Sequence, residues 1–191
     1  MKNSHLGNCE KLLALGLLLA LLSFIANAQQ PETNKEYLPN FHRVSESLYR
    51  GGQPKNGGLK KLSEMGVKTV IDLRGESDET RAEAREAKSL GLEFFNLPLS
   101  SSGRPDDEQV RRVLAIIDEK GNAPVFVHCR RGSDRTGVII ALYRIKQDGW
   151  TAEQAIKEAN LYGMGFIQFR KRHYINDYFK SLQTAGIAAK K

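Results

Sequence analysis

The chain has 191 residues, with 29 lysine and arginine residues against 22 aspartate and glutamate residues and a formal net charge of +7 at pH 7. This length allows one hydrophobic core and is too short for two comfortable domains. The modest basic excess suits anionic substrates, and because no basic stretch is interleaved with aromatic residues, nucleic acid is not expected as a partner.

The first 28 residues have the pattern of a secretory signal peptide. Residues 12–25 are almost wholly apolar, basic residues precede them, and Ala26-Asn27-Ala28 is a small-x-small cleavage site. The apolar run is shorter than the roughly 18 to 20 residues of a spanning helix, so we expect cleavage before Gln29 and no stable membrane anchor afterwards. A retained anchor is the alternative. The sequence therefore predicts a periplasmic or secreted protein with a signal peptide at 1–28 and a polar leader at 29–40.

Hydrophobic runs alternate with amphipathic stretches over residues 41–183. Residues 67–73 and 125–127 are rich in β-branched residues, as buried parallel strands are, and residues 93–97 supply a further short strand. Five stretches have helical character: residues 80–90, 106–119, 136–147, 151–162 and 168–182. This alternation predicts a single α/β domain with a mainly parallel central sheet flanked by helices, followed by a short tail at 184–191.

One cysteine, Cys129, follows the predicted cleavage site. Exported proteins usually pair their cysteines, and a lone thiol is either buried and inert or kept for its reactivity. Cys129 comes directly after a predicted strand and before a predicted helix, which is where open α/β sheets bind their ligands. The surrounding residues favour reactivity.

The segment from Cys129 to Arg135 has the properties of a loop that binds oxyanions. Its backbone amides can point inward at a helix N-terminus, and Gly132 permits the positive φ that such a tight turn needs. The same field would lower the pKa of the Cys129 thiol from about 8.5 to between roughly 3.5 and 7.5, which makes a thiolate nucleophile. The Arg135 guanidinium can bind two phosphate oxygens, Thr136 can donate its hydroxyl to the sulfur, and His128 can orient the loop from behind.

We expect attack on a phosphate ester to give a phosphocysteine intermediate, which divides one difficult displacement into two easier ones. The loop amides and Arg135 would stabilise the charge on the phosphate oxygens, so that neither a metal nor a cofactor is required. The residues predicted to bind phosphate are Arg130, Arg131, Gly132, Ser133, Asp134 and Arg135.

The motif His128-Cys129-x5-Arg135-Thr136 resembles the signature of the cysteine-dependent protein tyrosine and dual-specificity phosphatases. Residues 48–54 (Leu-Tyr-Arg-Gly-Gly-Gln-Pro), 70–74 (Val-Ile-Asp-Leu-Arg) and 141–144 (Ala-Leu-Tyr-Arg) resemble segments of the bacterial dual-specificity-like branch. The similarity extends over most of the region 41–183. It implies a cysteine-dependent phosphatase whose phosphate-binding loop lies between a strand and a helix.

The resemblance also implies an aspartate that protonates the leaving oxygen, and three aspartates are candidates. In that family the aspartate lies on a loop roughly 20 to 40 residues before the cysteine; Asp107 and Asp106, which follow Gly103-Arg104-Pro105, fall in this range, and we place Asp107 first. Their alternative role is structural, because acidic residues that follow a proline at a helix start commonly cap the helix. Asp134 is the third candidate, because Gly-x-Asp-Arg-Thr-Gly resembles bacterial phosphatases that act on phosphotyrosine and phosphoinositides, in which the loop aspartate serves as the acid. Those enzymes often have a lysine where this chain has Ser133.

The sequence allows two roles for each of three other arginines near the predicted site. Arg130 and Arg131 either attract polyanionic substrates to the loop or are merely solvated. Arg74 either supports the site or pairs with Glu76 or Asp78. His5, His42 and His173 do not have the spacing of metal ligands with acidic or cysteine partners.

The sequence predicts an exported phosphomonoesterase whose substrate is a phosphoprotein, a phosphoinositide or a soluble inositol phosphate. A non-catalytic phosphate-binding module is an alternative, against which the intact Cys129 and Arg135 argue. A sulfur-transfer or arsenate-reducing enzyme is a third possibility, although arsenate reduction usually needs resolving thiols that the predicted mature chain lacks.

Overall fold

In this computed structural model, residues 34–186 are described. The predicted signal peptide at 1–28, the first part of the leader and residues 187–191 lie outside the described residues. Residues 35–186 lie within one compact unit. Leu38 is fully buried in this unit, so the packed domain begins before the predicted start at residue 41. A single apolar residue within a polar, proline-containing stretch gives no periodic signal, which explains the difference.

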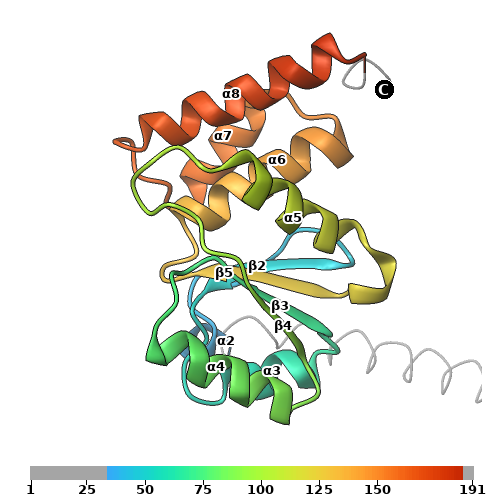
Figure 1. Ribbon diagram of the computed structural model, residues 1–191, viewed down its shortest axis with the longest axis vertical. Coiled ribbons are helices and arrows are strands. Elements are labelled where there is room, and N and C mark those ends of the chain that lie inside the picture. Colours follow the sequence, from blue (N-terminus) through green and yellow to red (C-terminus); the bar gives the residue numbers. More distant parts are fainter. Residues whose placement is uncertain (1–33, 187–191) are drawn as a thin grey trace, which may run out of the picture. The chain divides into compact units, whose positions relative to one another are not determined.

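A five-stranded sheet forms the centre of the unit (Figure 1). Its strands are β1 (His42–Arg43), β2 (Leu48–Gly52), β3 (Thr69–Asp72), β4 (Glu93–Asn96) and β5 (Val125–Cys129). The spatial order is β1-β2-β5-β3-β4; β1 pairs antiparallel with β2, and the other pairs are parallel. The predicted α/β fold with a mainly parallel sheet is confirmed, whereas β1 and β2 were not predicted as strands.

Helices cover both faces of the sheet (Figure 1). They are α2 (Asn34–Tyr37), α3 (Gly58–Glu64), α4 (Asp78–Ser89), α5 (Asp107–Asp118), the short 3₁₀ helix η1 (Lys120–Asn122), α6 (Asp134–Asp148), α7 (Ala152–Leu161) and α8 (Phe169–Thr184). Figure 1 shows α3 and α4 on one side of the sheet and α5 to α8 on the other. No helix in residues 34–186 is both long and apolar enough to cross a membrane.

The sheet has a hydrophobic core on each face, because successive side chains of a strand point to opposite faces. Val70 and Phe126 pack into the core beneath α3 and α4, while Ile71 and Val127 pack into the larger core against α5 to α8. Every residue of β3 and β5 is buried, as expected for parallel strands covered on both faces. The carboxyl end of β5 is thereby fixed between two packed layers.

The start of α6 differs from the starts of its neighbours. α4 and α7 begin with capping boxes, Ser77 with Thr80 and Thr151 with Gln154, whose side chains occupy the free N–H groups of the first turn. Ser133, at the N-cap position of α6, makes no side-chain capping bond. The first amides of α6 are therefore left to bind something other than a capping side chain.

Candidate active site

Cys129 is the last residue of β5, and Asp134 is the first residue of α6. The Cys129 loop (residues 129–135) thus lies between a strand and a helix, as the sequence predicts. Gly132 has φ 72°, and a Cβ atom at this residue would lie 2.5 Å from the backbone nitrogen of Gly52. Glycine is required here both for the backbone conformation and because the end of β2 passes so closely.

Three consecutive carbonyl groups of the loop are bound from its outer side. Arg130 O accepts a hydrogen bond from the Gln53 N–H (3.3 Å), Arg131 O from Asn40 Nδ2 (3.2 Å), and Gly132 O from Arg50 Nη2 (2.8 Å). In a trans peptide the N–H points away from the carbonyl of the same unit. These contacts, which we call the outer clamp (Asn40, Arg50 and Gln53), therefore turn the following N–H groups toward the inside of the loop.

Arg50 is the buried member of the outer clamp. It lies in the middle of β2 with 1% of its surface exposed, and its guanidinium stacks 4.5 Å from the centre of the Tyr162 ring. Burial lowers the pKa of Arg50 to about 10, while the charges of Glu158, Tyr162 and Cys129 act in the opposite direction. The side chain therefore stays positively charged at neutral pH, and it is electrostatically coupled to the cysteine.

The Cys129 sulfur is enclosed by groups that favour its thiolate form. The residue is 3% exposed, and burial alone would raise the pKa of the thiol. Hydrogen bonds from the hydroxyl and the backbone N–H of Thr136, the positive charge of Arg135 and the backbone N–H of Arg131 outweigh burial and hold the pKa below that of an ordinary thiol. These contacts therefore favour the thiolate of Cys129 over that of an ordinary thiol.

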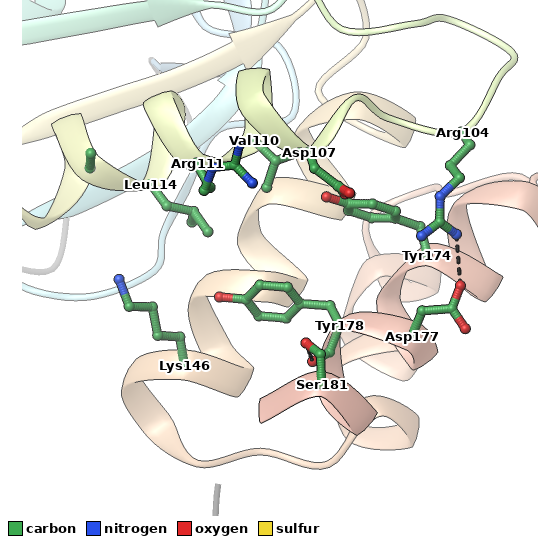
Figure 2. A pocket seen from close by; sticks show the side chains of 11 residues that line it. Arg104, Asp107, Val110, Arg111, Leu114, Lys146, Tyr174, Asp177, Tyr178 and Ser181 are labelled. Atoms are coloured by element: carbon green, nitrogen blue, oxygen red, sulfur yellow. Dashed lines mark hydrogen bonds and ion pairs between the residues drawn. The ribbon is translucent and has the colours of Figure 1, made fainter. Parts of the chain in front are cut away.

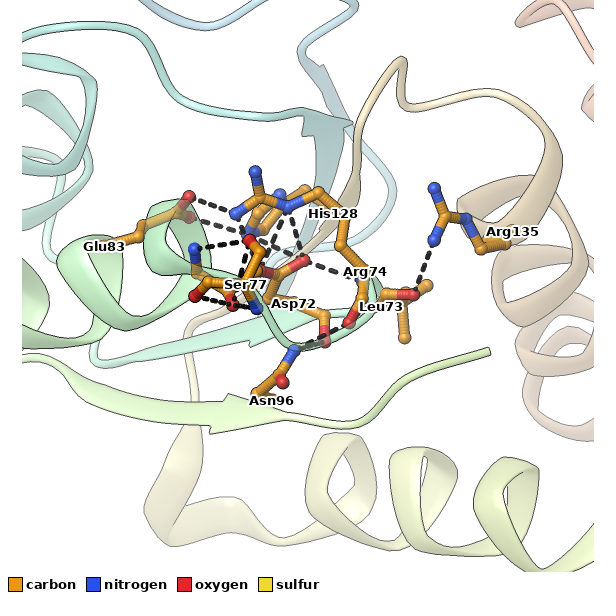
Figure 3. Close-up of polar contacts among 9 residues, drawn as sticks. Asp72, Leu73, Arg74, Ser77, Glu83, Asn96, His128 and Arg135 are labelled. Atoms are coloured by element: carbon orange, nitrogen blue, oxygen red, sulfur yellow. Dashed lines mark hydrogen bonds and ion pairs between the residues drawn. The ribbon is translucent and has the colours of Figure 1, made fainter. Parts of the chain in front are cut away.

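Arg135 is anchored at the end of the neighbouring strand. Its Nη1 donates a hydrogen bond of 3.0 Å to the carbonyl oxygen of Leu73, directly after β3 (Figure 3). This contact uses one edge of the guanidinium and fixes its position near the sulfur, whose pKa its charge lowers. The remaining N–H groups are available for phosphate oxygens.

A buried charged cluster lies behind the loop (Figure 3). The fully buried His128 has its Nε2 atom 2.9 Å from Glu83 Oε1 and 4.0 Å from Asp72 Oδ1. Arg74 binds Asp72 through Nε and Nη2 at 2.7 to 3.1 Å and Glu83 through Nη2 at 2.5 Å. The ligand atoms of Asp72, Glu83 and His128 lie within 4.8 Å of one another, a spacing that a metal ion could use. Arg74 already supplies a cation to both carboxylates.

Arg74 thus supports the site from behind, through the carboxylates that face His128. It does not pair with Glu76 or Asp78, which bind Arg81 instead. The pairing register places Asp72 directly opposite His128, so this cluster ties the end of β3 to the residue before the cysteine. Pairing register cannot be read from local sequence, which is why the partners were not predicted.

The three candidate acids lie in different surroundings. Asp106 is the N-cap of α5 and accepts a hydrogen bond of 3.0 Å from the Gln109 N–H, its predicted alternative role. Asp107 faces Tyr174 and lines a cavity of about 650 Å³ between α5, α6 and α8 (Figure 2). Burial, followed by the hydrogen bond with Asp107, raises the pKa of the Tyr174 hydroxyl.

Asp134 is the candidate that the structure brings to the Cys129 loop. Its side chain is buried; Oδ1 accepts a hydrogen bond of 3.0 Å from the Gly165 N–H, and Oδ2 binds Arg131 Nη2 at 2.6 Å. Asp134 therefore connects the loop to the segment between α7 and α8. The Arg131 side chain is 74% exposed despite this ion pair, and Arg130 is also exposed.

Lys171 is a residue of the site that sequence reasoning missed. It is fully buried, and its Nζ donates hydrogen bonds to Ser101 O (2.8 Å) and to Gln168 Oε1 (2.9 Å). Burial lowers the pKa of Lys171, and its charge interacts with those of Asp134, Arg135 and Cys129. The lysine ties the loop between β4 and α5 to α8 beside the cysteine. In the sequence it is one of several basic residues on a helix, so no signal distinguishes it.

The fold and the Cys129 loop together define the class of the protein, which is that of the protein tyrosine and dual-specificity phosphatases. Within this class, the chain belongs to the family described as DSP-PTPase phosphatase fused to NAD+ kinase, whose family model matches residues 24–177. The resemblance stated from the sequence is confirmed.

Two curated relatives and one solved structure illustrate the similarity. The dual specificity protein phosphatase TpbA of Pseudomonas aeruginosa is 33% identical over 127 residues, which cover 66% of this chain and 56% of TpbA. An inositol diphosphatase of Arabidopsis thaliana is 30% identical over 110 residues, 55% of this chain and 54% of that protein. A crystal structure of a P. aeruginosa TpbA variant in complex with pTyr has a TM-score of 0.63 and 29% identity, and the match covers 79% of this chain and 91% of that chain. The chain thus spans little more than half the length of these two curated relatives.

The outer clamp gives a direct prediction for Arg50→Met. The substitution removes a cation coupled to Cys129 and the bond that orients the Gly132 carbonyl, so the thiol pKa should rise. The rate of alkylation by iodoacetamide, measured against pH, reports this midpoint. Arg81→Met removes an arginine that pairs with Glu76 and Asp78 at the start of α4 and should leave the midpoint unchanged. Equal midpoints for Arg50→Met and the unsubstituted protein, at retained folding, contradict the assignment.

Proposed function

We propose that the protein hydrolyses phosphate monoesters through a phosphocysteine intermediate on Cys129. The observation that carries this proposal is the buried sulfur with a lowered pKa, held between the Thr136 hydroxyl, inward-facing loop amides and Arg135. A phosphate-binding module would need the amides and the arginine, but it has no use for an activated thiol. Membership of a phosphatase family supports the same conclusion.

The proposed reaction has two displacements at phosphorus. In the first, the thiolate forms a P–S bond while the P–O bond of the ester breaks and the leaving oxygen takes a proton from an aspartic acid of the protein. In the second, water forms a new P–O bond and returns a proton to that aspartate, the P–S bond breaks, and the thiolate leaves with the support of the Thr136 hydroxyl. The loop amides and Arg135 stabilise the phosphate oxygens in both steps because they are already oriented before the reaction begins.

The intermediate can be trapped chemically. After rapid mixing with a ³²P-labelled aryl phosphate and denaturation, the unsubstituted protein should retain radioactivity, and Cys129→Ser should retain none and lose turnover by on the order of 10³-fold or more. Cys9→Ser is the matched control in the full chain and should behave as the unsubstituted protein does. Undiminished turnover by Cys129→Ser would overturn the mechanism.

We assign the general acid to Asp134, because this candidate lies in the loop. Asp134→Asn should slow hydrolysis of an alkyl phosphate by on the order of 10²-fold, whereas p-nitrophenyl phosphate, whose leaving group needs little protonation, should slow far less. Asp107→Asn should change both rates by a similar small factor. If Asp134→Asn slows both substrates equally, its role is structural; a selective loss with Asp107→Asn would move the acid to Asp107.

Two substrate classes are supported by the relatives. The match to TpbA, a dual-specificity phosphatase with a pTyr complex among its structures, favours phosphotyrosyl proteins. The match to an inositol diphosphatase favours a bulky polyanion, and a hollow of about 740 Å³ with Lys55, Arg130 and Glu36 as its charged lining residues adjoins the loop. A phosphate-release panel of a phosphotyrosyl peptide, a phosphoinositide and inositol hexakisphosphate distinguishes the two classes: a tenfold preference in kcat/KM corresponds to about 1.4 kcal/mol in the transition state.

We also propose that the protein is exported to the periplasm or secreted, which rests on the signal-peptide pattern of residues 1–28. N-terminal sequencing of the exported protein tests whether it begins at Gln29.

A further inference from the structure

An exposed apolar surface lies at the connection between α7 and α8. Leu161, Phe166, Ile167 and Phe169 are 77%, 86%, 67% and 60% exposed, and they are four of the five large apolar residues that are exposed among residues 36–186. We call them the α7–α8 tip. Single exposed apolar residues are ordinary on a protein surface, but here four lie within nine residues of the sequence, and exposed apolar groups normally mark an interaction site.

The backbone holds these side chains outward. Met164 is 4% exposed and packs into the larger core, Gly165 N–H binds Asp134, and Phe166 O accepts a hydrogen bond of 2.5 Å from Arg172 Nη1. A second bond of 2.6 Å, from Arg172 Nη2 to Asn160 Oδ1, closes the connection from the other side. Because the segment is anchored at both ends, Phe166 and Ile167 cannot fold back onto the domain without breaking these bonds.

The tip is also next to the Cys129 loop. Besides the Gly165 to Asp134 bond, a Cβ atom at Gly163 would lie 3.5 Å from the Ser133 Cβ. Lys171, three residues into α8, interacts electrostatically with Cys129. In Figure 1 the connection from α7 to α8 lies at the left of the view, at the amino end of α8. A surface that contacts the tip therefore comes close to the phosphate-binding loop.

The charge around the tip is positive. Residues 157–173 contain four basic residues against the single acidic residue Glu158; Lys171 is buried, which leaves Lys157, Arg170 and Arg172 at the surface. Glu158 is bound by Arg144, which leaves no free acidic side chain in this segment. The exposed Arg130 and Arg131 of the loop add to this field. Exposed aromatic and aliphatic side chains with a basic surround match the interface of an anionic bilayer, in which apolar groups enter the headgroup region and basic groups meet lipid phosphates.

We propose that the α7–α8 tip docks the protein onto an anionic lipid surface and places the Cys129 loop at that surface. A bilayer fits the observations better than a protein partner does. A bilayer accepts projecting apolar side chains without a matching pocket, and its negative charge complements the basic residues without specific pairing. Docking itself is independent of catalysis; only the consequence that substrates at the membrane surface are reached faster rests on the proposed phosphatase activity.

Vesicle sedimentation tests this proposal. The protein used begins at Gln29, because the apolar run at 12–25 would itself bind lipid, and it retains the compact unit that contains residues 35–186 with both cores. It should sediment with vesicles of phosphatidylcholine containing 30 mol% phosphatidylglycerol, at about ten times the bound fraction found with phosphatidylcholine alone, and added salt should weaken the binding. The double substitution Phe166→Ser and Ile167→Ser should lower the partition coefficient about tenfold. Tyr37→Ser removes an exposed aromatic residue outside the tip and should leave the partition coefficient unchanged.

Turnover of p-nitrophenyl phosphate in free solution separates the two proposals. It should be equal within about twofold in the unsubstituted protein and in the tip variant, because both substituted side chains are largely exposed. An inactive protein that still binds vesicles through the tip refutes the proposed activity and leaves docking intact. Failure of the unsubstituted protein to bind anionic vesicles, or undiminished binding by the tip variant, overturns the docking proposal. An increase in KM for a phosphoprotein substrate, without vesicle binding, would instead make the tip a protein interface.

Discussion

The hydrogen bond from Arg50 to the Gly132 carbonyl is the constraint on which the site depends. It fixes the plane of one peptide in the loop, and with it the direction of the Ser133 N–H at the start of α6. The arrangement costs folding free energy, because Arg50 is buried while its Nε and Nη1 atoms have no hydrogen-bond partner among the described residues. An unsatisfied buried donor costs about 1 to 3 kcal/mol. A glycine at 132 and the Gly51–Gly52 end of β2 are needed for the same close approach.

The site is stabilised by charges arranged in two layers. In front, Arg135 and the loop amides face the sulfur and favour its anionic form. Behind, Arg74 offsets the two carboxylates that approach His128, so negative charge in the interior does not act uncompensated on the thiolate. The sheet register joins the layers, because β3 carries Asp72 and ends at Leu73, whose carbonyl binds Arg135. The end of β3 therefore positions both Arg74, which offsets the buried carboxylates, and Arg135, which lowers the pKa of Cys129.

Sequence reasoning located the Cys129 loop because its parts are contiguous. The strand, the cysteine, the glycine and the arginine fall within eleven residues, and each has a local physical signature. The residues it missed act over long sequence separations: Asn40 meets Arg131, Arg50 meets Gly132, and Lys171 meets Ser101. β2 was not predicted as a strand because its five residues include an arginine and two glycines, which lower strand propensity. Only the pairing with β5 shows why a buried arginine belongs there.

The aspartates show a different limit of sequence reasoning. A carboxylate suits a helix N-terminus and a general acid for the same reason, its negative charge and its ability to accept a hydrogen bond, so composition cannot separate the roles. The contacts separate them: Asp106 binds an amide of its own helix, while Asp134 binds the segment that carries the α7–α8 tip. This bond is one connection between the tip and the Cys129 loop, and Asn40, whose Nδ2 binds both Tyr162 O and Arg131 O, is another. A displacement of Gly165 would free one oxygen of Asp134, so a surface that contacts the tip can alter the hydrogen bonding of the residue that we propose as the general acid.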